Sequence, residues 1–303
     1  MKNYVIITRR VLLIIMAAVL SAVFLCVVFL SAPKDEAVSA SKKLLPIYCT
    51  EQQSKKISIS FDAAWGNEDT EQLIEILAKY NVKTTFFAVS EWVEKYPESV
   101  KALADAGHEV CNHSSTHPHM STLSKQDMVT EIENCNSKIE ALTGKRPLLF
   151  RAPYGDYNNA LIEVIESLDM YCIQWDVDSL DWKDISPSDI SSRVLSKVKP
   201  GSIVLFHNAA KNTPAALPGI LEKLISDGYE IVPISSLIYR DGYTIDHEGR
   251  QHPTETQSGT DTQSESDNQN SSDTQSSPAT QSSSDAQSPQ PDSSADTPSK
   301  KDE

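Results

Sequence analysis

Residues 57–89, ISISFDAAWGNEDTEQLIEILAKYNVKTTFFAV, decide the fold of this 303-residue chain. The first five residues alternate polar and apolar side chains, which is the pattern of a strand. Leu73, Ile74 and Leu77 then follow at helical spacing, and residues 84–89 form a second apolar run. A strand, a helix and a strand in this order predict two parallel strands, because parallel strands need a crossover between them.

The same strand-and-helix unit repeats to about residue 238. Further strands are predicted at 109–111, 148–150, 171–175, 202–206 and within 230–238. Seven strands that alternate with helices indicate an α/β protein with a parallel sheet. An open doubly wound sheet and a (β/α) barrel both fit this order. The glycine-rich fingerprints of nucleotide sites are absent from the sequence, which favours an irregular, TIM-like barrel of about seven parallel strands.

The N-terminus carries an apolar run, residues 11–30, without a charged side chain. At about 1.5 Å per residue, a helix of this length crosses the roughly 30 Å hydrocarbon core of a membrane. Lys2, Arg9 and Arg10 precede the run and predict a cytoplasmic N-terminus with the remainder of the chain outside. A cleaved signal peptide is the alternative, but its apolar region is normally only about 7–15 residues long. We therefore expect residues 1–33 to be a retained single-pass membrane anchor.

Composition divides the rest of the chain into an expected linker at 34–55, a folded domain at 56–240 and a polar tail at 241–303. From His252 onward the chain has ten acidic residues and two lysines, a net charge of −8 out of the total of −15. Such a tail buries too little apolar surface to offset its ordering entropy, so we predict that it is disordered. The shortage of clustered Lys and Arg argues against nucleic acid as a partner. We expect a monomer.

Polar or ionisable residues follow five of the predicted strands. Active sites of parallel barrels are built at the carboxyl ends of the strands, from several strands at once. One such residue carries no information, whereas a group from five strands indicates a site. The residues are Asp62, His113, His117, Arg151, Asp178, Asp181 and His207.

Two of these residues, His113 and His117, lie four residues apart, close enough for both imidazoles to reach one cation. Neutral imidazole suits zinc and other first-row metals. Taken alone the spacing is a weak signal, because histidines at the surface or in the core are common. Together with the acids at neighbouring strand ends, it favours a metal site.

The remaining strand-end residues suggest acid–base chemistry. Asp62 fits a general base that takes a proton from an attacking water, and His207 fits the opposing acid; each is also a common structural residue at a strand end. Arg151 is able to orient a carboxylate by a bidentate contact, or to lie in a surface loop. Asp178 and Asp181 precede Trp182, an aromatic ring suited to stacking on a sugar or to burial in a charged loop.

The order of these motifs resembles the polysaccharide deacetylases of carbohydrate esterase family four, over about residues 56–238. Four of the family's five motifs are intact. They are His113-Ser-Ser-Thr-His117, Arg151-Ala-Pro-Tyr154, Asp178-Ser-Leu-Asp181-Trp182 and Leu205-Phe-His207.

The resemblance implies a hydrolase that removes N-acetyl groups from a glycan such as peptidoglycan or a chitin-like polymer. A metal-bound water would attack the acetamide, with His113 and His117 as metal ligands. Asp62 corresponds to the catalytic base, His207 to the acid, Arg151 to the residue that holds the base and Asp181 to the one that tunes the acid. The Tyr154 N–H would contribute to the oxyanion hole. Tyr154, Trp182 and Leu205 would line the acetyl pocket.

The first motif departs from the family pattern Thr-Phe-Asp-Asp-Gly, whose second aspartate completes the metal ligands. Here Ser60-Phe-Asp-Ala-Ala-Trp-Gly66 has Ala63 at that position, and alanine cannot coordinate a cation. The resemblance implies a divalent metal, zinc by ligand type. Three outcomes stay open: Asp62 itself ligates the metal, water fills the gap, or little metal is bound. Similar departures occur in the sporulation-type branch of the family in Gram-positive bacteria.

Two other functions fit the sequence. A glycan-binding protein would keep the groove after losing its metal ligands, although it would have no need of the acid–base set. A different amide hydrolase, acting on a peptide link of the cell wall, is the third.

Overall fold

The structure, a computed structural model, describes residues 8–31 and 42–254. Its helix α1 (Arg9–Ser31) contains a span, Arg9–Val27, whose mean hydropathy of 2.7 suits a membrane crossing. A signal sequence near an N-terminus has the same length and composition. The expected linker residues 34–41 and tail residues 255–303 lie outside the described residues.

Seven strands form the central sheet in the order β6-β5-β4-β3-β2-β8-β7, and all neighbouring strands are parallel. A short strand β9 (Glu230–Ile231) pairs with the beginning of β2. The sheet curls into an irregular barrel, which confirms the predicted α/β fold. The seven strands are β2 (Lys56–Ala63), β3 (Thr85–Ala88), β4 (Glu109–Asn112), β5 (Leu149–Phe150), β6 (Tyr171–Cys172), β7 (Val177–Asp178) and β8 (Ile203–His207).

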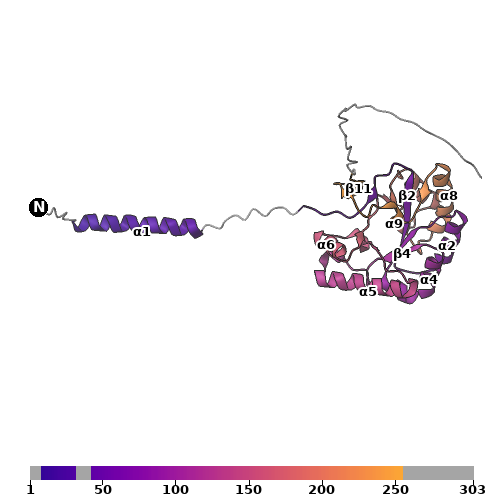
Figure 1. Ribbon diagram of the computed structural model, residues 1–303, viewed down its shortest axis with the longest axis horizontal. Helices are drawn as coiled ribbons and strands as arrows, with labels where there is room; N and C mark the ends of the chain where they lie inside the picture. Colours follow the sequence, from indigo (N-terminus) through magenta and orange to yellow (C-terminus); the bar gives the residue numbers. More distant parts are fainter. Residues whose placement is uncertain (1–7, 32–41, 255–303) are drawn as a thin grey trace, which may run out of the picture. The chain divides into compact units, whose positions relative to one another are not determined.

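Helices surround these strands, and Figure 1 shows α5, α4, α2 and α8 following one another around the outside. Serine side chains cap the first turns of two of these helices. Ser124 Oγ accepts a hydrogen bond from Asp127 N, and Ser186 Oγ accepts one from Asp189 N. The helices are α2 (Thr70–Lys79), α3 (Ser90–Lys95), α4 (Pro97–Asp105), α5 (Lys125–Thr143), α6 (Asn159–Ser167), α7 (Pro187–Leu195) and α8 (Thr213–Ser226).

The two faces of the sheet are packed differently. On the outer face, Phe61 stacks on Phe86 and Phe206, with ring centroids 4.8 and 5.6 Å apart, beneath the helices. The inner face is filled by smaller apolar residues, and the short helix α9 (Ile234–Leu237) packs among them. Ile234 N donates to Thr85 Oγ1 at the beginning of β3, so α9 closes the amino end of the barrel. The carboxyl ends of the strands are therefore the end available for a site.

The folded domain extends beyond the expected boundaries at residues 56 and 240. Three further strands, β1 (Cys49–Thr50), β10 (Tyr243–Ile245) and β11 (Arg250–Pro253), form a second sheet in the order β1-β11-β10. The fully buried Gln251 bonds through its side chain to Tyr239 N and O. Part of the expected linker and the start of the expected tail are thus folded. Strands this short show no sequence alternation, and the partners β1 and β11 are about 200 residues apart.

Candidate active site

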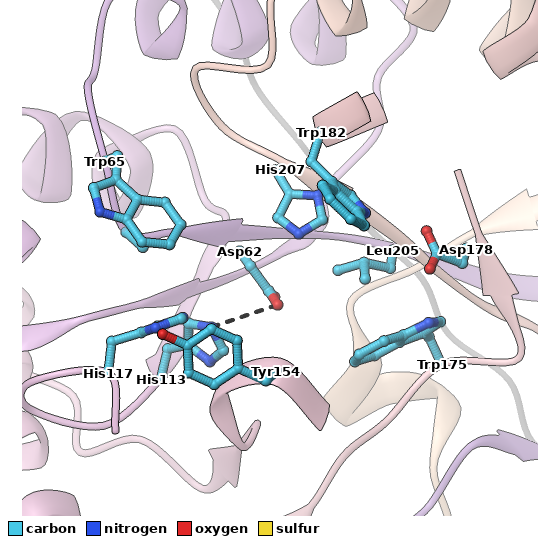
Figure 2. A pocket seen from close by; sticks show the side chains of 11 residues that line it. Asp62, Trp65, His113, His117, Tyr154, Trp175, Asp178, Trp182, Leu205 and His207 are labelled. Atoms are coloured by element: carbon cyan, nitrogen blue, oxygen red, sulfur yellow. Dashed lines mark ion pairs between the residues drawn. The ribbon is translucent and has the colours of Figure 1, made fainter. Parts of the chain in front are cut away.

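A cavity of about 430 Å³ opens at the carboxyl ends of the strands. Figure 2 shows Asp62 and His207 in its middle, with aromatic side chains on both sides. Two predicted residues, Arg151 and Asp181, are fully buried and bond to Asp62 and His207. The residues that line the cavity are Asp62, Ala64, Trp65, His113, His117, Tyr154, Trp175, Asp178, Trp182, Leu205 and His207.

Asp62 lies at the end of β2 and is only 7% exposed. Arg151 Nη1 donates to Asp62 Oδ1 at 2.7 Å, and His113 Nε2 lies 3.6 Å from Asp62 Oδ2. Burial on its own raises the pKa of Asp62, but the charge and hydrogen bond of Arg151, together with the nearby His113 and His207, outweigh burial and the net effect lowers the pKa. The carboxylate is therefore ionised at neutral pH.

Arg151 does not make the bidentate contact that the sequence suggested. One guanidinium nitrogen, Nη1, bonds to Asp62, while Nη2 donates to Ser60 Oγ at 2.9 Å and to Gln174 O at 3.3 Å. The guanidinium carbon also lies 4.1 Å from the centroid of the Phe87 ring. These contacts hold the guanidinium in one orientation, and the guanidinium in turn positions the Asp62 carboxylate.

His207 ends β8 and is held by a buried aspartate. Its Nδ1 lies 2.8 Å from Asp181 Oδ1, and its backbone N–H donates to Asp181 Oδ2 at 2.8 Å. Thr213 Oγ1 donates to the same oxygen at 2.7 Å. Burial lowers the pKa of His207, but the hydrogen bond and charge of Asp181 outweigh it and raise the pKa above its ordinary value. Because Nδ1 is taken, Nε2 is the atom that is left for chemistry in the pocket.

The two other pocket histidines are neutral. His113 Nδ1 lies 2.8 Å from Arg151 O, so Nδ1 carries the proton and Nε2 has a free lone pair. Burial lowers the pKa of His113. Burial is also the main cause that lowers the pKa of His117 to about 4, and the nearby His113 adds to it. The buried His117 Nδ1 has no hydrogen-bond partner in the described part of the chain. The ring centroids are 5.0 Å apart, as the predicted pairing of these imidazoles requires.

These residues fit a metal ion only in part. The two imidazoles offer free nitrogens, but no group of three or more His, Cys, Asp or Glu side chains in residues 8–31 and 42–254 is placed to hold a metal. Ala63 is fully buried and packs in the apolar cluster beneath the helices, while its neighbours Asp62 and Ala64 line the pocket. Position 63, where the family pattern has a carboxylate as the third metal ligand, therefore carries no ligating atom.

Aromatic side chains line the rim of the pocket, and two of them, Tyr154 and Trp182, belong to the motifs in the sequence. Trp65 is 67% exposed, Tyr154 61% and Trp182 56%. Trp65 and Trp175 had no role in the sequence-based site, although a tryptophan three residues after the strand-end Asp62 was a signal. Tyr154 has a φ of 60°, a left-handed conformation that is rare for a bulky residue and is found at functional sites.

Sequence comparisons find relatives among the polysaccharide deacetylases. Residues 50–173 match the family model described as polysaccharide deacetylase. The peptidoglycan-N-acetylmuramic acid deacetylase PdaC of Bacillus subtilis is 33% identical over 68% of this chain and 42% of its own length. A peptidoglycan-N-acetylglucosamine deacetylase of Bacillus cereus is 30% identical over 60% of this chain and 68% of its own. The chain spans 42 to 60% of the length of three of the curated relatives, PdaC among them.

Solved structures show the same fold. A Bacillus anthracis protein described as a CE4 family pseudoenzyme superimposes with a TM-score of 0.62, at 34% identity over 68% of this chain and 70% of its own. A mutant of that protein is described as having restored enzymatic activity. The similar solved structures therefore include a protein described as a pseudoenzyme and an active mutant of the same protein.

Proposed function

Because the chain belongs to the polysaccharide deacetylase family, we propose that it hydrolyses N-acetyl groups of an amino-sugar polysaccharide outside the membrane. One observation carries the proposal: Asp62 and His207 share one pocket, and each is held by its own buried partner. Two of the relatives are named as peptidoglycan deacetylases, which favours peptidoglycan as the glycan.

The first proton transfer uses Asp62 as a general base. A water molecule attacks the acetamide carbonyl carbon, and Asp62 takes the proton that the water loses as its new C–O bond forms. The charge of Arg151 keeps Asp62 ionised and its contacts with Ser60 keep the carboxylate oriented.

The second proton transfer uses His207 as the acid. As the C–N bond breaks, His207 gives its Nε2 proton to the departing amine, and acetate is released. Asp181 holds Nδ1–H and stabilises the imidazolium that donates the proton. The Tyr154 N–H is the proposed donor to the carbonyl oxygen, which becomes negative in the intermediate. Trp182, Leu205 and the Tyr154 ring surround the acetyl methyl group.

His113 and His117 are the side chains that would hold a divalent cation, with zinc favoured by imidazole ligands, and a bound cation would polarise the acetamide carbonyl. With no carboxylate at position 63, we propose that water completes the coordination and that the cation is held weakly. Neither proton transfer by Asp62 or His207 depends on this cation.

The test is acetate release from peptidoglycan and from N-acetylglucosamine oligomers, with and without chelator. We expect Asp62→Asn and His207→Ala to lower kcat by roughly 10²–10⁴, the usual range for positioned acid–base groups. The exposed residues Asp241 and His247 provide matched controls, because Asp241→Asn and His247→Ala make the same changes away from the pocket. Full activity in Asp62→Asn would contradict the mechanism.

A glycan-binding protein without catalysis is the second candidate. The incomplete ligand set at Ala63 and the likeness to a pseudoenzyme favour it. A binder would have no use for the Asp62–Arg151 and His207–Asp181 pairs, which cost desolvation to bury. Binding of N-acetylglucosamine oligomers by the wild type without any acetate release would establish this alternative.

A further inference from the structure

The exposed aromatic side chains of the domain gather at the pocket. Within residues 42–254, five large apolar side chains are markedly exposed, and three of them line this cavity: Trp65, Tyr154 and Trp182. Trp182 and Tyr154 belong to the proposed acetyl pocket, whereas Trp65 has no part in the proton transfers. An indole that is 67% exposed beside a cleft is typical of a surface that contacts a ligand.

The backbone around Trp65 is held rigidly. The next carbonyl, Gly66 O, accepts hydrogen bonds from Trp92 Nε1 and from Asn208 Nδ2, and Asn208 N donates to Asp62 O. Gly66 has a φ of 60°, and a Cβ there would lie 2.8 Å from Ala209 Cβ. The turn is therefore tied both to the core and to the residues after β8. Such anchoring fixes the backbone that carries Trp65 before a ligand arrives, which reduces the entropy lost on binding.

Trp65 lies apart from the acetyl pocket. Figure 2 shows Trp65 on one side of Asp62 and His207, and Trp182 and Leu205 on the other. The Trp65 ring contacts the His117 ring edge-on, with centroids 5.1 Å apart, which leaves its exposed surface at the rim. If the acetyl group of a substrate enters beside Leu205, the part of the substrate that reaches Trp65 therefore lies beyond the reacting group.

We propose that Trp65 is a stacking platform for a second sugar ring next to the residue that reacts. This inference rests on the proposed function. The apolar C–H faces of a sugar ring pack against an aromatic face, so a glycan chain gains contact area that a single amino sugar lacks. Trp65 thereby makes the protein select an amino sugar that is linked to a neighbouring sugar over a free amino sugar.

The experiment compares acetate release from free N-acetylglucosamine and from its pentamer. We expect Trp65→Ala to lower kcat/KM for the pentamer by roughly tenfold, mainly through KM, and for the free sugar by less than threefold. Trp65→Phe keeps an aromatic face and should retain most of the preference for the pentamer. Leu148→Ala truncates an exposed apolar residue outside the pocket and serves as the control. Equal losses on both substrates, or no loss on either, would overturn the proposal.

Binding measurements separate this proposal from the proposed function. Calorimetric titration with the pentamer should show roughly tenfold weaker binding by Trp65→Ala than by wild type, whether or not acetate is released. An absence of acetate release together with this loss of affinity would refute the deacetylase activity and support the platform. Unchanged affinity in Trp65→Ala would refute the platform alone. Thermal unfolding of each variant identifies a loss of binding that comes from misfolding.

Discussion

The two proton-transfer residues have environments that move their pKa values apart. Arg151 favours the charged form of Asp62, and Asp181 favours the charged form of His207. One group is thus a base and the other an acid over the same pH interval, as acid–base catalysis requires. The pH dependence of activity follows from these two directions.

The loss of activity at alkaline pH should result from deprotonation of His207. Because its pKa is raised, the acid form is present below that pKa and is lost as the pH rises through it. Asp181→Asn removes the charge that raises the pKa, so the decline in kcat/KM should begin at a lower pH than in wild type. The decline on the acid side, set by Asp62, should stay below the ordinary pKa of an aspartate in both proteins, because the pKa of Asp62 is lowered.

Thr213→Val is the matched control for this measurement, because Thr213 donates a hydrogen bond to Asp181 Oδ2 but carries no charge. It should displace the alkaline side much less than Asp181→Asn. An unmoved profile in Asp181→Asn would show that His207 is not the acid.

Position 63 offers a test of the incomplete metal site. Ala63 is fully buried among apolar side chains, so Ala63→Asp should lower the melting temperature in chelator, because a carboxylate there lacks a partner. If the family's ligand geometry is preserved, added Zn²⁺ should raise the melting temperature of Ala63→Asp more than that of wild type. Ala63→Asp combined with His113→Ala should lose this response. No zinc-dependent stabilisation in Ala63→Asp would show that its carboxylate stays on the helix side of the sheet.

Strand ends were the part of the site that the sequence predicted well. A parallel sheet brings the carboxyl ends together, so Asp62, His113 and His207 were expected to meet, and they line one pocket. The hydrogen bonds of Arg151 to Ser60 and Gln174 depend on side-chain directions across strands, which sequence order does not contain. The role of Trp65 was missed because its rim position depends on the turn at Gly66.

At the scale of elements, the long periodic segments were predicted, whereas some of the short ones were not. Helix α5 and strand β2 span several repeats of their patterns, so their positions follow from the sequence. Strand β7 and helix α3, with two and six residues, are too short for a period to be recognised. The region expected to contain a strand, residues 230–238, has the short strand β9 at its start and then helix α9, because the chain turns to cover the amino end of the barrel.

The second sheet sets where the domain ends. A chain ending at Thr256 keeps β11 and should unfold at the wild-type temperature. A chain ending at Gly249 loses buried Gln251 and the pairing with β1, so its melting temperature should fall by roughly 5 °C or more. Thermal unfolding of both truncated chains in detergent measures this difference. Gln251→Ala isolates the contribution of the side-chain hydrogen bonds to Tyr239. Equal melting temperatures for wild type, both truncated chains and this variant would contradict the proposed domain boundary.

At the scale of the whole molecule, helix α1 is proposed as a retained anchor with the barrel outside the cell. Lys2, Arg9 and Arg10 precede the apolar span, which orients the chain by the distribution of positive charge. Protease added to intact cells should therefore remove the domain, while a cytoplasmic marker protein stays intact. A soluble protein whose N-terminus lies near Ser41 would show instead that the span is a cleaved signal.

The parallel pairing of β1 with β11 also has a mechanical consequence. The chain passes from β1 into the rest of the domain and leaves the domain through the end of β11. Tension along the chain therefore pulls these two strands in opposite directions along their length, and the bonds Tyr48 N to Gly249 O and Glu51 N to Gln251 O are loaded together in shear. Strands β2 and β8, which hold Asp62 and His207, belong to the other sheet, so the load carried between β1 and β11 does not pass through the pairing of β2 with β8.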